Sequence, residues 1–281
     1  MGSRLRLASI NTNGIRAAYR KGMGAWLDAR DVDILAIQEV RASTDDIQGL
    51  LGPEWNVLHD EATAKGRAGV ALASRRKAEI HRVDLGAKTF DSAGRWLEAD
   101  YDVDGTIVTV VSTYVHSGEA DTPKQDEKWK FLDAMSRRLP QLQKQNELAV
   151  VVGDLNVGHT PLDIKNWKGN VKRAGFLPRE RAYFDRFFGP AGKKVETADG
   201  SAGKGLGWVD VGRRSAGDVE GPYTWWSWRG AAFDNDTGWR IDYQMATPAL
   251  ASRVTNYAVD RAESYDKRWS DHTPVVVDYD I

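Results

Sequence analysis

The sequence predicts one domain of mixed α/β class over residues 1–281, with sheets packed between helices. Short runs rich in β-branched residues recur along the chain and indicate strands. Two other stretches have the composition or the apolar spacing of three and four that indicates a helix. No linker or internal repeat divides this pattern, and the glycine-rich stretch 198–207 is interpreted as a loop within the domain.

The strands are predicted from runs of six to nine residues. The first, "LRLASIN", alternates apolar and polar residues, as a strand with one solvated face would. The run "ELAVVVGD" is apolar along most of its length, which favours a strand buried on both faces. The predicted strands are 5–11, 32–38, 69–74, 106–114, 147–154, 240–247 and 274–280.

The two predicted helices lie around Gly22–Arg30 and from Pro123 to Gln145. Pro123 suits the first turn of a helix, where no backbone N–H is needed. Pro140 lacks that N–H within the helix and is expected to kink or interrupt its far end. One face of the longer helix would carry Trp129, Leu132, Met135, Leu139 and Leu142.

Composition and charge bound the class of protein. Hydrophobic residues make up 41% of the 281 residues and charged residues 28%, as in a soluble globular protein. The absence of cysteine excludes disulfides, thiolate metal sites and cysteine nucleophiles, and it fits a reducing compartment. Without a long apolar run we expect no membrane contact and a cytoplasmic location, associated with the nucleoid in a bacterium.

The formal net charge of −1 gives no global attraction for nucleic acid, but basic residues gather locally. The stretch 164–194 holds nine Lys or Arg against Glu180 and Asp185. Such a surface can contact phosphates, because these interactions are short-ranged in salt. A merely solvated charged surface is the alternative interpretation.

Several common chemistries are excluded by missing motifs. The chain has no G-x-x-x-x-G-K-[ST], no G-x-S-x-G and no H-E-x-x-H, and "GKGLGW" does not match G-x-G-x-x-G. These absences argue against P-loop and dinucleotide sites, serine hydrolases of the elbow type and zinc proteases.

Polar side chains occur where most of the predicted strands end or begin. Strand ends of one sheet can meet, and oxygen ligands without cysteine indicate magnesium or manganese rather than zinc. Each residue alone has a plainer interpretation, as a turn, a helix cap or a half-buried strand residue. These residues are Asn11, Glu39, Tyr114, Asp154, Asn156, Asp242, Asp271 and His272.

The stretch "GDLN" is the strongest of these features. A carboxylate such as Asp154 at the end of an apolar run is costly unless it is paired or used. Asn156, two residues on along an extended backbone, would point to the same side. Gly153 is expected to allow close approach of a phosphate or metal.

Together these pieces resemble the exonuclease III type of apurinic/apyrimidinic (AP) endonuclease, within the endonuclease/exonuclease/phosphatase superfamily. The matching pieces occur in the family's order over nearly the whole chain. The resemblance implies a four-layered α/β sandwich of the deoxyribonuclease I type, with two packed mixed sheets flanked by helices. The pieces are "ASINTNGIRA", "DILAIQE", "GVALAS", "GDLNVGHTPLDI", "GWRIDYQMAT" and "SDHTPVV".

The resemblance also implies roles for the strand-end residues. Glu39 and Asn11 would hold Mg²⁺, for which Mn²⁺ can substitute, with Asp271 as a further ligand. Asp154 would orient or activate the attacking water, and Asn156 would bond the phosphate or the aspartate. His272 would contact a non-bridging oxygen of the phosphate, and Asp242 would orient its ring. Tyr114 would contact the phosphate or assist departure of the leaving oxygen.

Trp225 and Trp239 would wall a pocket for a flipped sugar without a base, although a plain hydrophobic cluster is the alternative. Ser117 and Ala120 are small where the family often carries a larger side chain, so Arg229 is expected to compensate by inserting into the duplex. The expected DNA contacts are Asn13, Lys165, Lys168, Lys172 and Arg229.

The implied activity is metal-dependent cleavage of the phosphodiester 5′ to an abasic site, leaving a 3′-hydroxyl. Exonuclease action from 3′ to 5′ and release of 3′-phosphate or 3′-phosphoglycolate are expected as well. The expected partner is double-stranded DNA with abasic sites or blocked 3′ ends, bound by a monomer. Two alternatives remain: a phosphodiesterase or phosphatase for inositol phosphates or lipids, and a catalytically dead DNA-binding relative.

Overall fold

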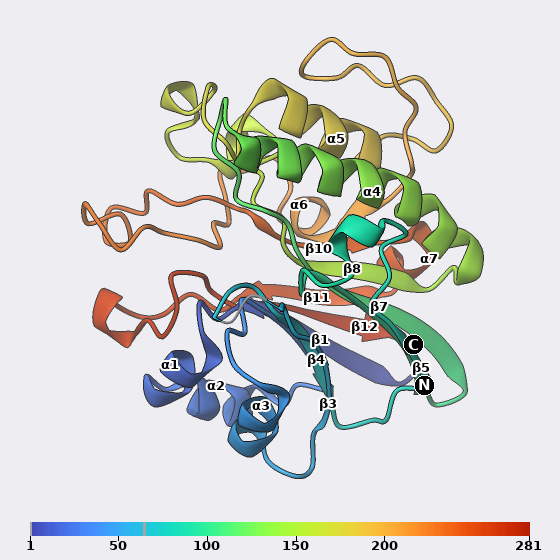
Figure 1. The fold of residues 1–281 in the computed structure, drawn as a ribbon, viewed down its shortest axis with the longest axis vertical. Helices are drawn as coiled ribbons and strands as arrows, with labels where there is room; N and C mark the ends of the chain where they lie inside the picture. The colour runs from blue at the N-terminus through green and yellow to red at the C-terminus, as the bar shows by residue number, and fades with distance from the viewer. Residues whose placement is uncertain (1, 64–65) are drawn as a thin grey trace.

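The computed structural model describes residues 2–63 and 66–281. Two six-stranded β-sheets pack against each other, and helices cover the outer side of each (Figure 1). Both sheets are mixed, because each contains one parallel pair among antiparallel ones. The four-layered α/β sandwich implied by the resemblance is therefore confirmed.

The first sheet has the strand order β11-β12-β1-β2-β4-β3. Its centre is β1, which runs parallel to β2 and antiparallel to β12. The strands are β1 (Arg4–Asn11), β2 (Ile34–Gln38), β3 (Asn56–Asp60), β4 (Val70–Ser74), β11 (Val254–Val259) and β12 (Val275–Asp280).

The second sheet has the order β5-β6-β7-β8-β10-β9. Here β8 runs parallel to β7 and antiparallel to β10. The strands are β5 (Ile80–Arg82), β6 (Trp96–Val103), β7 (Thr106–Tyr114), β8 (Ala149–Asp154), β9 (Val209–Asp210) and β10 (Asp242–Ala246).

The helices separate into two outer layers (Figure 1). The layer on the first sheet consists of α1 (Ile15–Arg20), α2 (Met23–Arg30) and α3 (Thr44–Leu51). The second sheet is covered chiefly by α4 (Pro123–Gln145) and α5 (Pro178–Phe188), with α6 (Val211–Ala216) and α7 (Pro248–Ala251) near its edge. Short 3₁₀ turns occupy Lys88–Phe90, Pro161–Asp163, Trp167–Gly169 and Tyr265–Lys267.

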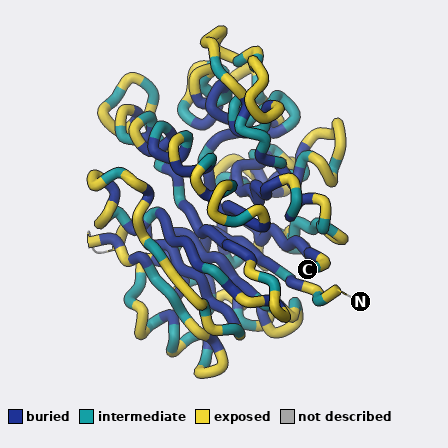
Figure 2. Tube along the Cα trace, turned by 90° about the vertical axis from the view of Figure 1, so that its right-hand side faces the viewer, coloured by how far each residue is buried: buried dark blue, intermediate teal, exposed yellow. Residues whose placement is uncertain are grey.

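The apolar character of β8 is explained by burial on both faces. Val150 and Val152 belong to the core cluster between the sheets, whereas Ala149 and Val151 pack in the cluster under α4. Such two-sided burial is the reason that the strand shows no alternation of apolar and polar residues. Figure 2 shows the same arrangement as dark strands at the centre and exposed loops at the periphery.

The longer predicted helix has the predicted bounds, but Pro140 does not interrupt it. The interruption was a wrong prediction, because Leu139 and Leu142 on either side of the proline are buried and anchor the last turns. The buried face is wider than the predicted one and includes polar residues. Lys128 is fully buried there, while Trp129 is only partly covered.

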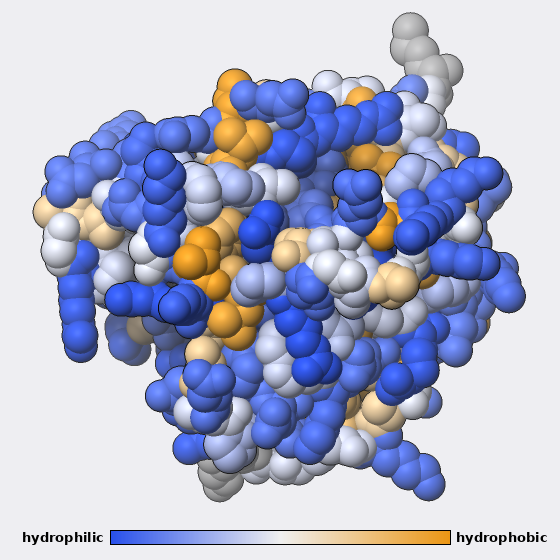
Figure 3. All heavy atoms as spheres, turned by 90° about the horizontal axis from the view of Figure 1, so that it is seen from above, coloured by the Kyte–Doolittle hydropathy of each residue, from blue (hydrophilic) through white to orange (hydrophobic). Residues whose placement is uncertain are grey.

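Among the described residues, no helix is long and apolar enough to cross a membrane. Figure 3 shows the molecule from above the view of Figure 1, where most of the surface is hydrophilic and hydrophobic groups are scattered. The fold therefore places its apolar residues mainly in the layers between and beneath the sheets.

Candidate active site

One row of the second sheet carries three of the candidate residues. Tyr114 ends β7 and lies beside Asp154 at the end of β8, in parallel register. Asp242, the first residue of β10, faces Asp154 from the other side in antiparallel register. The strand pairing thus brings together residues that lie 40 and 88 positions away from Asp154 in the chain.

The first sheet supplies the other half of the site. Asn11 ends β1 and pairs with Gln38, and Glu39 directly follows that residue at the end of β2. The side-chain amide of Asn11 donates to Glu39 Oε1 and to Asp154 Oδ2, both at 2.9 Å. One buried asparagine therefore connects the two sheets at the point where their strand ends meet.

Asp154 is almost completely buried and accepts several hydrogen bonds. Asn156 donates its backbone N–H to Oδ1 at 2.9 Å and its side-chain amide to Oδ2 at 3.0 Å. The sequence left open whether Asn156 would bond the phosphate or the aspartate, and its amide here bonds the aspartate. Burial raises the pKa of Asp154 to about 7, against the opposing charge of His272. The carboxylate can therefore accept a proton near neutral pH.

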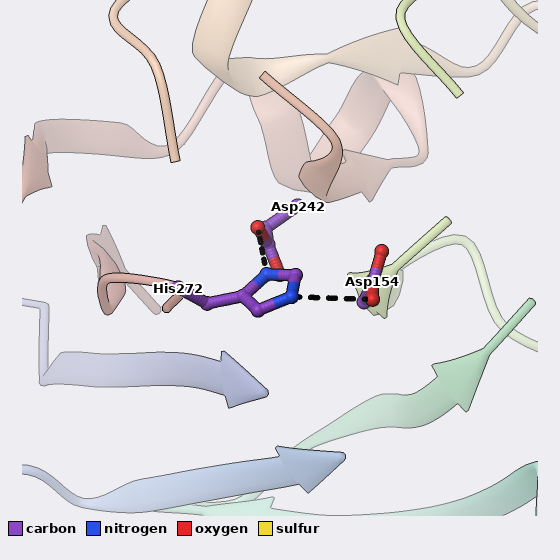
Figure 4. Close-up of side chains that lie close together, drawn as sticks. All are labelled: Asp154, Asp242 and His272. Atoms are coloured by element: carbon purple, nitrogen blue, oxygen red, sulfur yellow. Dashed lines mark hydrogen bonds and ion pairs between the residues drawn. The ribbon is translucent and has the colours of Figure 1, made fainter. Parts of the chain in front are cut away.

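His272 lies between two carboxylates (Figure 4). Its Nδ1 is 2.9 Å from Asp242 Oδ2, and its Nε2 is 3.7 Å from Asp154 Oδ2. Burial lowers the pKa of His272, but the charges of Asp242 and Asp154 outweigh this effect and raise the pKa to about 10. The imidazole is consequently charged at neutral pH, and Asp242 fixes the orientation of its ring.

Gly153 serves strand packing rather than approach to a ligand. Its φ is +140°, and an added Cβ would lie 1.9 Å from the carbonyl oxygen of Thr113 on β7. Glycine is therefore required for the close contact between β7 and β8. We expected a phosphate or metal to lie close to this glycine, but the backbone that lies close to it is that of the neighbouring strand.

A cavity of about 390 Å³ opens above these strand ends. Trp225 and Trp239 stand on its wall with ring centroids 6.2 Å apart and planes at 88°. Trp239 packs against the bare backbone of Gly175, where an added Cβ would lie 2.8 Å from the indole. Further lining residues are Glu39, Arg41, Tyr114, Ser117, Gly118, Asp154, Asn156, Asp271 and His272.

Asp271 lies at the same cavity, next to the tryptophan wall. It accepts from the side-chain amide of Asn13 at 3.1 Å and from the indole N–H of Trp225 at 3.1 Å. Burial raises the pKa of Asp271, yet the charge of His272 and these hydrogen bonds outweigh it and lower the pKa. Asn13 thus positions a carboxylate of the site in this structure.

Arg95 is a site neighbour that sequence reasoning missed. Its guanidinium lies 4.6 Å from the ring centroid of Tyr114 and donates to the Tyr114 carbonyl at 3.1 Å. Burial raises the pKa of Tyr114, and the charges of Glu39 and Asp154 add to this effect, so the phenol stays neutral. Arg95 precedes β6, and an arginine before a strand does not by itself indicate a functional site.

The expected DNA-contacting residues lie on the surface. Lys165 pairs with Glu220, and Lys168 lies with its ammonium 5.8 Å from the ring of Trp167. Lys172 lines a second cavity, together with Trp129 and residues 120–123. Arg229 is exposed on the loop that follows Trp225. Their contact with DNA stays a prediction.

The oxygen-rich donor set fits a hard divalent cation. Glu39, Asp154 and Asp271 line one cavity, and carboxylate oxygens are the ligands that Mg²⁺ and Mn²⁺ prefer. Asp154, Asp242 and His272 also place one potential ligand atom each within 4.8 Å of one another. A charged imidazole has no free lone pair for a metal, so the ring is better suited to binding an anion.

The chain matches the model of the endonuclease/exonuclease/phosphatase family from residue 8 to residue 272. This match includes every strand end that forms the site. The chain belongs to the endonuclease/exonuclease/phosphatase family.

Relatives within this family match the chain over nearly its whole length. An exodeoxyribonuclease of Bacillus subtilis is 30% identical over 273 residues, which are 96% of this chain and 98% of the relative. The solved structure of an AP endonuclease from Archaeoglobus fulgidus has a TM-score of 0.79 and 27% identity, covering 99% and 100% of the two chains. A Neisseria 3′ phosphatase bound to a product DNA hairpin has a TM-score of 0.79 and 25% identity, with the same coverage.

Proposed function

We propose that this protein is a divalent-metal-dependent DNA repair hydrolase that cleaves the phosphodiester 5′ to an abasic site. The products are a 3′-hydroxyl and a 5′-phosphate on the abasic residue. The proposal includes 3′→5′ exonuclease action and removal of 3′-phosphates from blocked ends. It is carried by one observation: a buried Asp154–His272–Asp242 arrangement beside a cavity walled by two tryptophans. The exodeoxyribonuclease and AP endonuclease relatives support the same reaction.

Each polar side chain of the site has a separate role in cleavage of the phosphodiester. Asp154 accepts a proton from the attacking water, whose oxygen forms the new bond to phosphorus. His272 donates its Nε2–H to a non-bridging oxygen and offsets the negative charge that develops there. Tyr114, a neutral phenol beside Arg95, donates to the leaving 3′-oxygen. Asn156 keeps the carboxylate of Asp154 in place.

Glu39, Asn11 and Asp271 are the proposed ligands of Mg²⁺ or Mn²⁺. The amide N–H groups of Asn11 are used on Glu39 and Asp154. Its Oδ1 accepts the backbone N–H of Asn13 at 2.9 Å and has a second lone pair that would serve the metal. Bound there, the ion supplies positive charge that polarises the phosphoryl group. Arg41 forms an ion pair with Glu39 at the rim of this site.

The tryptophan wall supports abasic DNA over inositol phosphates or lipids as substrate. Trp225 and Trp239 give the cavity an apolar wall that suits a deoxyribose without its base, and a flipped normal nucleotide needs more room. We further propose backbone contacts by Lys168 and Lys172, and insertion of Arg229 into the duplex gap. The protein acts on duplex DNA as a monomer in this proposal.

The test is incubation of the protein with a duplex that carries one abasic site, with and without Mg²⁺. The expected result is a nick on the 5′ side of that site only when the ion is present, and a 3′-end that a polymerase can extend. A duplex without the lesion and a soluble inositol phosphate serve as comparison substrates. Absence of a metal-dependent nick, or faster release of phosphate from inositol phosphate, overturns the proposal.

A further inference from the structure

A fully buried lysine lies beneath the catalytic cavity. Lys128 is on α4, and its ammonium makes three contacts that match its three N–H donors. They are Glu180 Oε1 on α5 at 2.6 Å, the backbone oxygen of Asn156 at 2.8 Å and that of Ser117 at 3.2 Å. The ammonium therefore joins two loops that are 39 residues apart.

Both of these loops line the cavity, and each loop follows a strand that ends in a catalytic side chain. Asn156 has a left-handed backbone, with φ of +51°, and its side chain bonds Asp154 and the carbonyl of Val115. Holding its carbonyl fixes the peptide whose side chain orients Asp154. Ser117 follows Tyr114 by three residues, so its carbonyl contact fixes the turn after β7.

The loop after β7 rests directly on the helix that carries the lysine. Gly118 has φ of +74°, and an added Cβ would lie 3.1 Å from Lys128 Cδ and 2.3 Å from Gln125 Oε1. Glycine favours this contact, because the positive φ disfavours other residues and an added Cβ would displace the side chains of Gln125 and Lys128.

The anion of the pair anchors a third segment of the site. Glu180 accepts the backbone N–H of Leu177 through Oε2 at 2.9 Å and the amide of Gln125 through Oε1 at 3.1 Å. Leu177 directly precedes α5 and lies two residues after Gly175, against which Trp239 packs. The Lys128–Glu180 pair consequently connects three segments that line the cavity.

A structural role alone does not account for such a pair. A buried ion pair contributes little net stability, since apolar residues of similar volume often serve as well. We propose that Lys128, held by Glu180, is a positioning residue that sets Asn156 and the turn after Tyr114 relative to the scissile phosphate. This inference rests on the proposed phosphodiester cleavage and adds a determinant of its rate that touches no substrate.

The test compares two buried ion pairs whose cations both lie on α4. Lys128→Met/Glu180→Gln removes the proposed anchor without leaving an unpaired charge. Arg138→Met/Glu98→Gln removes a matched pair, in which Arg138 contacts Glu98 at 2.6 and 2.7 Å away from the cavity. Single-turnover cleavage of an abasic duplex and affinity for that duplex are measured at a temperature where circular dichroism shows both variants folded.

The Lys128 variant is expected to lose about 10- to 100-fold in the single-turnover rate, because a small misplacement of reacting groups has effects of this order. Its affinity for the duplex is expected to change much less. The Arg138 variant is expected to lose stability but to keep the wild-type rate within about twofold, since its pair contacts no loop of the site. Equal rates in the Lys128 variant and the wild type, or equal losses in both variants, overturn the inference.

Two further variants distinguish loss of positioning from loss of folding. Glu180→Gln keeps the lysine and its two carbonyl contacts but removes the counter-ion that holds the ammonium, so the rate is expected to fall clearly less than in the double variants. Lys128→Gln/Glu180→Gln keeps polar groups at both positions but cannot reach both carbonyls, so the rate is expected to fall again. A rate loss in Glu180→Gln as large as in the double variants contradicts positioning by the lysine. Because all rates are ratios to the wild type, an inactive wild type instead refutes the proposed function.

Discussion

Asp154 and Asp242 face each other across the antiparallel strands β8 and β10. Two carboxylates at adjacent buried positions repel, and His272 resolves this by lying 2.9 Å from Asp242 and 3.7 Å from Asp154. The imidazolium therefore interacts with two carboxylates. Asp242 orients its ring, and Asp154 can accept a proton from water. The contacts of this network lead to the first prediction.

Asp154→Asn removes the proposed acceptor of the water proton while keeping the size of the side chain. We expect the cleavage rate of abasic duplex to fall by roughly 10²- to 10⁴-fold, the range for loss of a general base. Circular dichroism and thermal unfolding check that the fold persists. A variant that retains full activity refutes the catalytic role of Asp154.

Trp239→Ala opens the wall of the cavity that we propose to hold the abasic sugar. Cleavage at an abasic site is expected to fall by about tenfold or more, whereas release of a 3′-phosphate from a duplex end falls less, because that reaction needs no flipped sugar. The ratio of the two activities in one preparation is the measurement. Trp167→Ala, at a tryptophan outside the cavity lining, is the control. An unchanged ratio contradicts the pocket assignment.

Gly153→Ala places a Cβ against the Thr113 carbonyl in a backbone region that disfavours side chains. Strain of this kind costs of order 1–3 kcal/mol, and the clash adds to it. We expect lower stability in urea unfolding and a loss of cleavage, because β7 and β8 must separate and move Tyr114 away from Asp154. Gly49→Ala in α3 meets no atom within 4 Å and is expected to be neutral or stabilising.

Acid is expected to destabilise the fold through Asp163. Burial would raise the pKa of this carboxyl, but Arg240 and Arg213 outweigh burial and hold the pKa well below its usual range. A depressed pKa in the folded state means that the stabilisation is fully present above the unfolded value near 3.8 and declines as the pH falls below it. Urea unfolding at pH 7 and pH 3 measures this decline.

Asp163→Asn provides the comparison for that pH dependence. The variant is expected to be less stable than the wild type at pH 7, because Arg240 then keeps only Asp210 as a charged partner. Its stability is also expected to fall less steeply between pH 4 and pH 3. Parallel slopes for both proteins would show that other carboxyls account for the acid sensitivity.

Chelation with EDTA is expected to abolish cleavage and to leave the fold nearly unchanged. Asn11, Glu39 and Asp271 are held by protein groups, so the strand ends do not depend on the ion for their positions. Added Mg²⁺ or Mn²⁺ restores the activity in this prediction. Glu39→Gln is expected to need about tenfold more Mg²⁺ for half-maximal cleavage. Full activity in EDTA sinks the metal requirement.

The sequence allowed a mixed α/β domain and the meeting of strand ends to be predicted, because β8 is a short apolar run and α4 has apolar residues at spacings of three and four. The sandwich of two packed sheets followed from the family resemblance. Sequence reasoning failed where tertiary packing decides. Pro140 stays within α4 since Leu139 and Leu142 are buried on either side, and a local rule cannot detect that. The role of Gly153 depends on the position of Thr113, which lies 40 residues earlier in the chain.

Lys128 shows the same limit for the candidate site. It lies four residues before Leu132 and therefore on the apolar face of α4, which was a signal that a lysine there is buried. Its partner Glu180 is 52 residues away, and the two carbonyls belong to loops, so nothing local identifies what it binds. Arg95 likewise reaches Tyr114 only through the pairing of β6 and β7.

The contact of Asn11 with both Glu39 and Asp154 has a consequence for the cell that makes this protein. One sheet carries Asn11 and Glu39, and the other carries Tyr114, Asp154 and Asp242. A chain that has formed only one sheet holds half of the charged groups and no cavity between them. A newly made chain is therefore expected to gain cleavage activity only when both sheets have formed and packed together.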